Sequence, residues 1–79
     1  MEERILEILA AIRPENDFRN SEDFVLEGLL DSFDIVQLVD ALDREFGISI
    51  DGMDILPENF NSTVKIVGLL TKNGASNAT

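Results

Sequence analysis

Apolar residues recur at helical spacing near the start of the chain. In residues 2–13 they are separated by three or four positions, which places them on one face of a helix that Pro14 would end. These positions are Ile5, Ile8, Leu9 and Ile12. Residues 14–31 keep no helical period, and a loop of this length in a small domain is normally held by its own anchors. The candidate anchors are Phe18, Phe24, Val25, Leu26, Leu29 and Leu30.

The clearest helical pattern covers residues 32–46. Ser32 is a favoured N-cap residue, Asp34 places negative charge in the first turn, and Gly47 suits the position after the last turn. The apolar stripe of this helix consists of Ile35, Leu38, Val39, Leu42 and Phe46. We therefore expect a long helix with Ser32 as its N-cap.

The rest of the chain predicts a short helical turn and a final helix. Residues 48–53 alternate apolar and polar positions but have no second strand to pair with, so we expect a loop there. Residues 56–60 are typical of a single helical turn with a proline near its start. Ser62 or Thr63 can cap the last helix. One face of that helix carries Thr63, Ile66, Val67 and Leu70.

Together these elements predict an all-α fold, a small antiparallel four-helix bundle with a long first loop. Three of the four helices are long, and the remaining one, which is the third in chain order, is short. We expect residues 1–72 to form the domain and residues 73–79 to form a flexible polar tail. The expected core consists of Ile5, Ile8, Leu9, Ile12, Leu38, Val39, Leu42, Phe46, Phe60, Ile66, Val67 and Leu70.

The composition removes several classes of function. The 79 residues include no His and no Cys, so the usual general base, the thiol nucleophile and the commonest zinc ligands are missing. The formal net charge of −10 repels a phosphate backbone, which argues against nucleic-acid binding. No apolar run approaches the roughly 18 residues of a membrane span, and the first residues do not resemble a signal peptide. We expect a monomeric cytoplasmic protein with no membrane insertion, no metal site and no catalytic activity of its own.

The excess of negative charge lies in residues 22–58, where Arg44 is the only basic residue. Such a field steers basic partners toward the protein, although an acidic surface also serves solubility alone. A serine between two carboxylates lies at the centre of this acidic stretch, in the segment Asp31-Ser32-Phe33-Asp34. Capping statistics alone favour a plain N-cap role for this serine.

The sequence around this segment resembles the acyl carrier protein family, which includes peptidyl and D-alanyl carrier proteins. Asp31-Ser32-Phe33-Asp34 takes the place of the family's attachment motif, Asp-Ser-Leu or a close variant, with Phe33 instead of the usual leucine. Residues 23–32 look like the end of the family's long first loop. Residues 42–50 look like the end of its second helix, and residues 58–66 like its third helix and the entry to its fourth. About 70 of the 79 residues fit this pattern in order.

The resemblance implies that Ser32 carries 4′-phosphopantetheine, which a separate phosphopantetheinyl transferase takes from coenzyme A. The thiol of this arm then holds an acyl or aminoacyl group as a thioester. The implied partners are the transferase, an acyl- or aminoacyl-loading ligase and downstream acyl-transfer enzymes. A chain without a thiol of its own needs such an imported one, and a helix N-terminus tolerates a phosphodiester well.

The resemblance also implies that partner enzymes bind the helix that follows Ser32. The expected recognition residues are Asp31, Phe33, Asp34, Val36, Gln37 and Asp40. Gln37 replaces a frequent glutamate of the family and Asp40 a frequent apolar residue, so partner choice need not follow that of better-known carriers. The alternative for Phe33 and Val36 is that they pack beneath the long loop.

Two questions stay open at this level. The alternative function is a non-modified, acidic helical protein-interaction module in which Ser32 is only a cap. The cargo is not specified either. The Gly28-Leu29-Leu30-Asp31-Ser32 run lacks the Gly-Ala-Asp-Ser form frequent in fatty-acid carriers. It therefore favours a specialised carrier of an aminoacyl, D-alanyl or secondary-metabolite acyl group.

Overall fold

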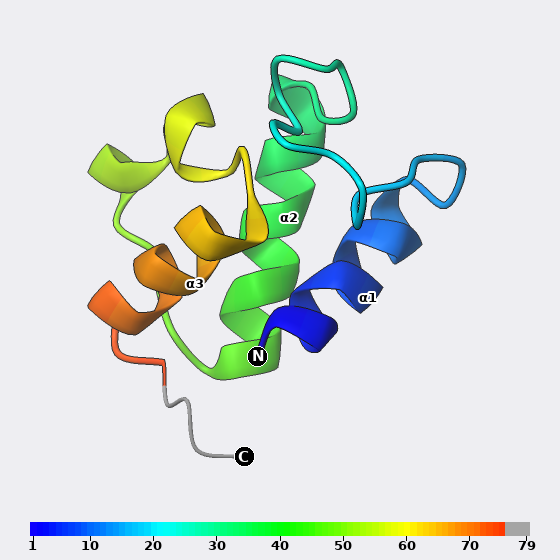
Figure 1. Ribbon diagram of the computed structural model, residues 1–79. Helices are drawn as coiled ribbons and strands as arrows, with labels where there is room; N and C mark the ends of the chain where they lie inside the picture. Colours follow the sequence, from blue (N-terminus) through cyan, green and yellow to red (C-terminus); the bar gives the residue numbers. More distant parts are fainter. Residues whose placement is uncertain (76–79) are drawn as a thin grey trace.

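Three α-helices form the framework of the computed structural model, which describes residues 1–75. They are α1 (Glu2–Ile12), α2 (Ser32–Phe46) and α3 (Thr63–Lys72). Figure 1 shows α2 running through the middle of the molecule, with α1 and α3 on either side of it in this view. Helix α1 packs against both α2 and α3. Residues 1–75 contain no strand, so the all-α prediction is confirmed for the described part of the chain.

The connection between α2 and α3 holds two short 3-10 turns, η1 (Gly52–Asp54) and η2 (Pro57–Asn59). The predicted helical turn with a proline at its start is η2, where Pro57 occupies one of the first two positions. Each 3-10 turn is only three residues long, so the count of four helices is not confirmed.

The helix ends follow the local chemistry of the sequence. Helix α1 stops at Ile12, one residue before the Arg13-Pro14 pair, and the Arg13 N–H donates to the Leu9 carbonyl. Helix α2 ends at Phe46 and is followed by Gly47, whose φ of 64° is the left-handed conformation that glycine adopts without a Cβ penalty. The Ser62 side chain accepts a hydrogen bond from the Lys65 N–H and so caps α3. The predicted roles of Gly47 after α2 and of Ser62 as the cap of α3 are therefore confirmed.

The long first loop supplies part of the core. Phe18 and Phe24 are buried and meet edge to face, with ring centroids 5.1 Å apart. The loop is fixed to the body because the Phe24 N–H donates to the Asn61 carbonyl at 2.8 Å. Leu30 is also buried, whereas Leu26 is 85% exposed, so Leu26 is not an anchor.

The predicted core is right for most of its members and wrong for four. Fully or nearly fully buried are Ile5, Ile8, Leu9, Leu38, Leu42, Phe60, Ile66 and Leu70. Only partly buried are Ile12, Val39, Phe46 and Val67. Loop and helix residues that the prediction omitted fill the space instead: Phe18, Phe24, Leu30, Ile35, Ile50 and Leu69. Phe18, Phe24 and Leu30 come from the long first loop, so this loop completes the core that the helices form.

Part of the predicted tail, residues 73–75, lies within the described residues. Asn73 caps α3, its side-chain amide donates to the Leu69 carbonyl, and the Ala75 side chain is buried against the core. Residues 73–75 thus contact the rest of the fold, and the remaining part of the predicted tail, 76–79, lies outside the described residues. Within the described part of the chain, no helix has the length and apolarity needed to cross a membrane.

Candidate functional site

Ser32 is the first residue of α2 and is exposed to solvent. The start of α2 lies at the top of Figure 1, where the long loop joins this helix. The loop is folded tightly just before it, because the N–H groups of Leu29 and Leu30 both donate to the Phe24 carbonyl. The serine is thus presented on a fixed corner of the fold.

The N-cap of α2 is Asp31, not Ser32. The Asp31 carboxylate accepts a hydrogen bond from the Asp34 N–H at 2.9 Å, and the Asp34 carboxylate accepts one from the Asp31 N–H at 3.1 Å. This is a capping box in which two aspartates satisfy each other's backbone donors. The prediction that Ser32 caps the helix is therefore wrong, since Asp31 already does so one residue earlier. The Ser32 hydroxyl is not needed for capping.

Asp34 is buried, which corrects the prediction that partners read it from the surface. Its carboxylate accepts a hydrogen bond from the Arg13 Nε at 2.9 Å, and only 8% of its side chain is exposed. Burial raises the pKa of Asp34, but the hydrogen bonds from Arg13 and from the Asp31 N–H, with the Arg13 charge, more than offset it. The pKa of Asp34 therefore lies below its usual range, and the group is ionised at neutral pH.

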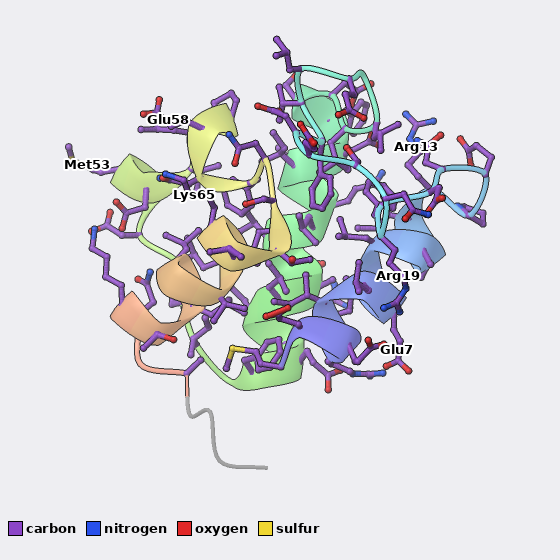
Figure 2. The ribbon with its side chains drawn as sticks, viewed as in Figure 1. Glu7, Arg13, Arg19, Met53, Glu58 and Lys65 are labelled. Carbon is purple, nitrogen blue, oxygen red and sulfur yellow. The ribbon has the colours of Figure 1, made fainter. Side chains whose placement is uncertain are left out.

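Arg13 joins the end of α1 to the start of α2, and Figure 2 shows its side chain at that corner of the molecule. Besides Asp34, its guanidinium lies 3.5 Å from an Asp31 carboxylate oxygen and 3.5 Å from one of Glu15. The charge of these carboxylates raises the pKa of Arg13 further, after the larger effect of the Asp34 hydrogen bond. The sequence prediction missed Arg13, because nothing in its spacing points to a partner 21 residues away.

The exposed face of α2 carries the other predicted recognition residues. Phe33 is 72% exposed and Val36 is 61% exposed, so the alternative in which they pack beneath the loop is wrong. Gln37 and Asp40 are exposed beside them, as is Asp31 at the start of the helix. Asp40 also pairs with Arg44 one turn further along. The structure therefore brings five of the six predicted recognition residues to one surface next to Ser32.

This arrangement suits a serine that accepts a group rather than one that attacks a substrate by itself. The chain has no His to act as a base, and the two nearby carboxylates are engaged in the capping box. The first turn of α2 leaves the N–H groups of Ser32 and Phe33 without helical acceptors, and the helix dipole adds a partial positive charge there. An anion attached to Ser32 would be stabilised at this position.

Comparison with known proteins finds similarity over most of the chain. The family model described as "Phosphopantetheine attachment site" matches residues 3–70, from α1 nearly to the end of α3. The D-alanyl carrier protein of Bacillus velezensis is 32% identical over 72 residues, which represent 89% of this chain and 92% of that protein. Both comparisons therefore concern the whole fold and not a short motif.

Proposed function

The chain belongs to the family of carrier proteins with a phosphopantetheine attachment site, and we propose that Ser32 is the residue that bears the 4′-phosphopantetheine. A carrier of this family has no catalytic activity of its own. The observation that carries the assignment of Ser32 is the Asp31 cap. Because Asp31 caps α2, the exposed Ser32 hydroxyl is free to be modified without loss of the helix end.

Attachment forms one bond and breaks one bond. The Ser32 Oγ bonds to the phosphorus of the pantetheine phosphate of coenzyme A, and the phosphoanhydride bond breaks, which releases adenosine 3′,5′-bisphosphate. The serine proton passes to a base that the transferase provides, which agrees with a chain that has no His. At the first turn of α2, the Ser32 and Phe33 N–H groups and the helix dipole would stabilise the anionic phosphodiester. When attached, the arm supplies the thiol on which the cargo is held as a thioester.

Carrier proteins interact with phosphopantetheinyl transferases, ligases and acyl-transfer enzymes. For this chain we propose the exposed face of α2 as the surface they bind. Phe33 and Val36 offer apolar contact, while Asp31 and Asp40 offer negative charge to a basic groove. Asp34 takes no direct part, because it is buried against Arg13.

The cargo that we propose is a small aminoacyl group such as D-alanyl. The Bacillus velezensis relative is named a D-alanyl carrier protein, and the chain aligns with 92% of its length. The run from Gly28 to Ser32 also lacks the form frequent in fatty-acid carriers. Loading assays with an ATP-dependent D-alanine ligase and with a long-chain acyl ligase distinguish the two classes of cargo.

Three finer features of the expected carrier also belong to the proposal. We propose that η1 and η2 together take the place of the short third helix of a four-helix carrier bundle, since they bridge α2 and α3. We propose a carrier domain that extends to Ala75, whose side chain is buried in the core. We also propose that the protein is a monomer and acts in the cytoplasm, where coenzyme A is available.

The test is the intact mass of the protein after incubation with coenzyme A and a broad-range phosphopantetheinyl transferase. The wild type should gain the mass of one phosphopantetheine, Ser32→Ala should gain nothing, and Ser49→Ala, which removes another exposed serine, should behave like the wild type. An unmodified wild type would favour the non-modified interaction module. The interaction module assumes that Ser32 serves only as a helix cap. The structure does not support this assumption, because Asp31 caps α2.

A further inference from the structure

Two side chains from the corner after α1 hold the segment that contains Ser32. The Arg13 Nε donates to the Asp34 carboxylate, and the Asn16 side-chain amide donates to the Leu29 carbonyl at 3.0 Å. Ser32 lies between these two points in the chain. The segment is thus fixed on both sides of the serine by residues of a different part of the fold.

The contact through Arg13 reaches the serine's immediate neighbours. The Asp34 carboxylate oxygen that accepts from Arg13 is the same oxygen that accepts from the Asp31 N–H. The other half of the capping box is the Asp34 N–H bond to Asp31. A shift of Arg13 would therefore move the residue before Ser32 and the residue two positions after it together.

Arg13 also determines the charge around the serine. Asp31 and Asp34 place two negative charges next to Ser32, and the Arg13 guanidinium lies within 3.5 Å of both carboxylates. Among the described residues, Arg13 is the basic side chain that pairs with both of them. Without it, the negatively charged phosphate donor would approach an uncompensated acidic pair.

We propose that Arg13 is a positioning residue for the modification of Ser32: it anchors the Asp31–Asp34 capping box to α1 and so holds the serine hydroxyl in the orientation that the transferase requires. This inference rests on the proposed function. It assigns to Arg13 an effect on the chemical step and not on the docking of the partner. Because a small displacement of a reacting atom lowers the rate of a bound complex, the effect should be seen in kcat.

The other ion pairs provide a matched comparison. Arg19 makes two hydrogen bonds of 3.0 Å to the Glu3 carboxylate, and both partners are largely exposed. Figure 2 shows Arg19 beside α1, below the corner that Arg13 occupies. The variants Arg13→Gln and Arg19→Gln change the net charge by the same amount. They differ in whether the lost contact reaches the neighbours of Ser32.

The experiment measures kcat and KM of the transferase on the full-length apo protein, with circular dichroism used to show that each variant is folded at the assay temperature. We expect Arg13→Gln to lower kcat about tenfold with KM within about twofold, which corresponds to about 1.4 kcal/mol in the barrier. Arg13→Lys keeps the charge and should recover part of the loss, although its single ammonium cannot reproduce the guanidinium fork. Arg19→Gln should remain within about twofold of the wild type in both constants.

A folded Arg13→Gln with the wild-type kcat, or with a changed KM alone, overturns the inference. If Arg13→Gln does not fold, the same criteria apply to Arg13→Lys, which retains a cation for Asp34. Failure of the proposed function looks different, since in that case the wild type itself gains no phosphopantetheine.

Discussion

The Asp34 N–H donates to the Asp31 carboxylate at 2.9 Å, and this hydrogen bond caps α2 around the exposed serine that lies between the two residues. The fold thus separates helix capping from modification, two roles that the sequence pattern assigns to Ser32 alone. Asp31 caps the start of α2, and the Ser32 hydroxyl remains free at this helix N-terminus. The helix end therefore does not depend on the Ser32 hydroxyl.

The first prediction compares two serines at helix starts. Ser62→Ala should lower the free energy of unfolding by about 1 kcal/mol, because the Ser62 hydroxyl accepts from the Lys65 N–H and caps α3. Ser32→Ala should change it by less than about 0.5 kcal/mol, as is usual for surface substitutions. Urea denaturation of the unmodified protein measures both. A Ser32→Ala loss as large as that of Ser62→Ala would mean that Ser32 is a cap after all.

A second pair of variants tests the core that the loop builds. Phe24→Ala should lower the free energy of unfolding by about 3–5 kcal/mol, because the ring is 1% exposed although it belongs to a loop. Phe33→Ala removes the same side chain from a site that is 72% exposed and should change stability by less than about 0.5 kcal/mol. Thermal and urea unfolding give both values. Similar losses for the two variants would contradict the described packing of the loop.

The third prediction concerns acid unfolding. The folded state holds the pKa of Asp34 below its usual value of about 3.9, so the stabilisation from this group is fully present above that value. It is lost as the pH falls through the lowered folded-state pKa. Asp34→Asn should therefore be less stable than the wild type at pH 7, and the difference should shrink as the pH falls below about 4.

Glu3→Gln is the control for this pH series. Arg19 lowers the pKa of Glu3 as well, but that pair is exposed and solvent screening makes its contribution small. The measurement is the urea midpoint of wild type and both variants between pH 2 and 7. A constant difference between wild type and Asp34→Asn over this range would show that Asp34 does not titrate at a lowered pKa.

The fourth prediction tests the exposed face of α2. Phe33→Ala should raise the KM of the transferase several-fold with little change in kcat, because the ring is available for contact and does not support the fold. Asp40→Asn should slow association a few-fold at low salt, and Arg44→Gln should speed it, because Asp40 and Arg44 pair on this surface with opposite charge. Both charge effects should decline as salt is added. Equal effects of the two charge variants would exclude electrostatic steering by this face.

Local signals in the sequence were sufficient to predict the helices. The spacing of apolar residues located α1, α2 and α3 to within one residue, and Gly47 and Ser62 marked ends that the structure confirms. The apolar anchors of the loop were harder to predict, since a loop has no period that separates a buried Phe24 from an exposed Leu26.

The site was predicted only in part for a similar reason. The motif pointed to Ser32 and to an exposed helix face, and the structure places Phe33, Val36 and Gln37 on that face. Aspartate and serine both cap helices well, so composition alone does not tell which of two adjacent residues does so. The buried position of Asp34 depends on its ion pair with Arg13, which follows the end of α1. This pairing arises only when the chain is folded, so the local sequence does not predict it.

The attachment of phosphopantetheine to Ser32 is tested most directly by locating it within the modified protein. Trypsin cleavage after Arg19 and Arg44 gives a peptide, residues 20–44, that contains Ser21 and Ser32 and no threonine. Fragmentation of this peptide by tandem mass spectrometry, after treatment of the full chain with coenzyme A and transferase, distinguishes the two serines. The account predicts fragments in which Ser32 alone carries the added mass. The same mass on Ser21, or on a peptide other than residues 20–44, would contradict it.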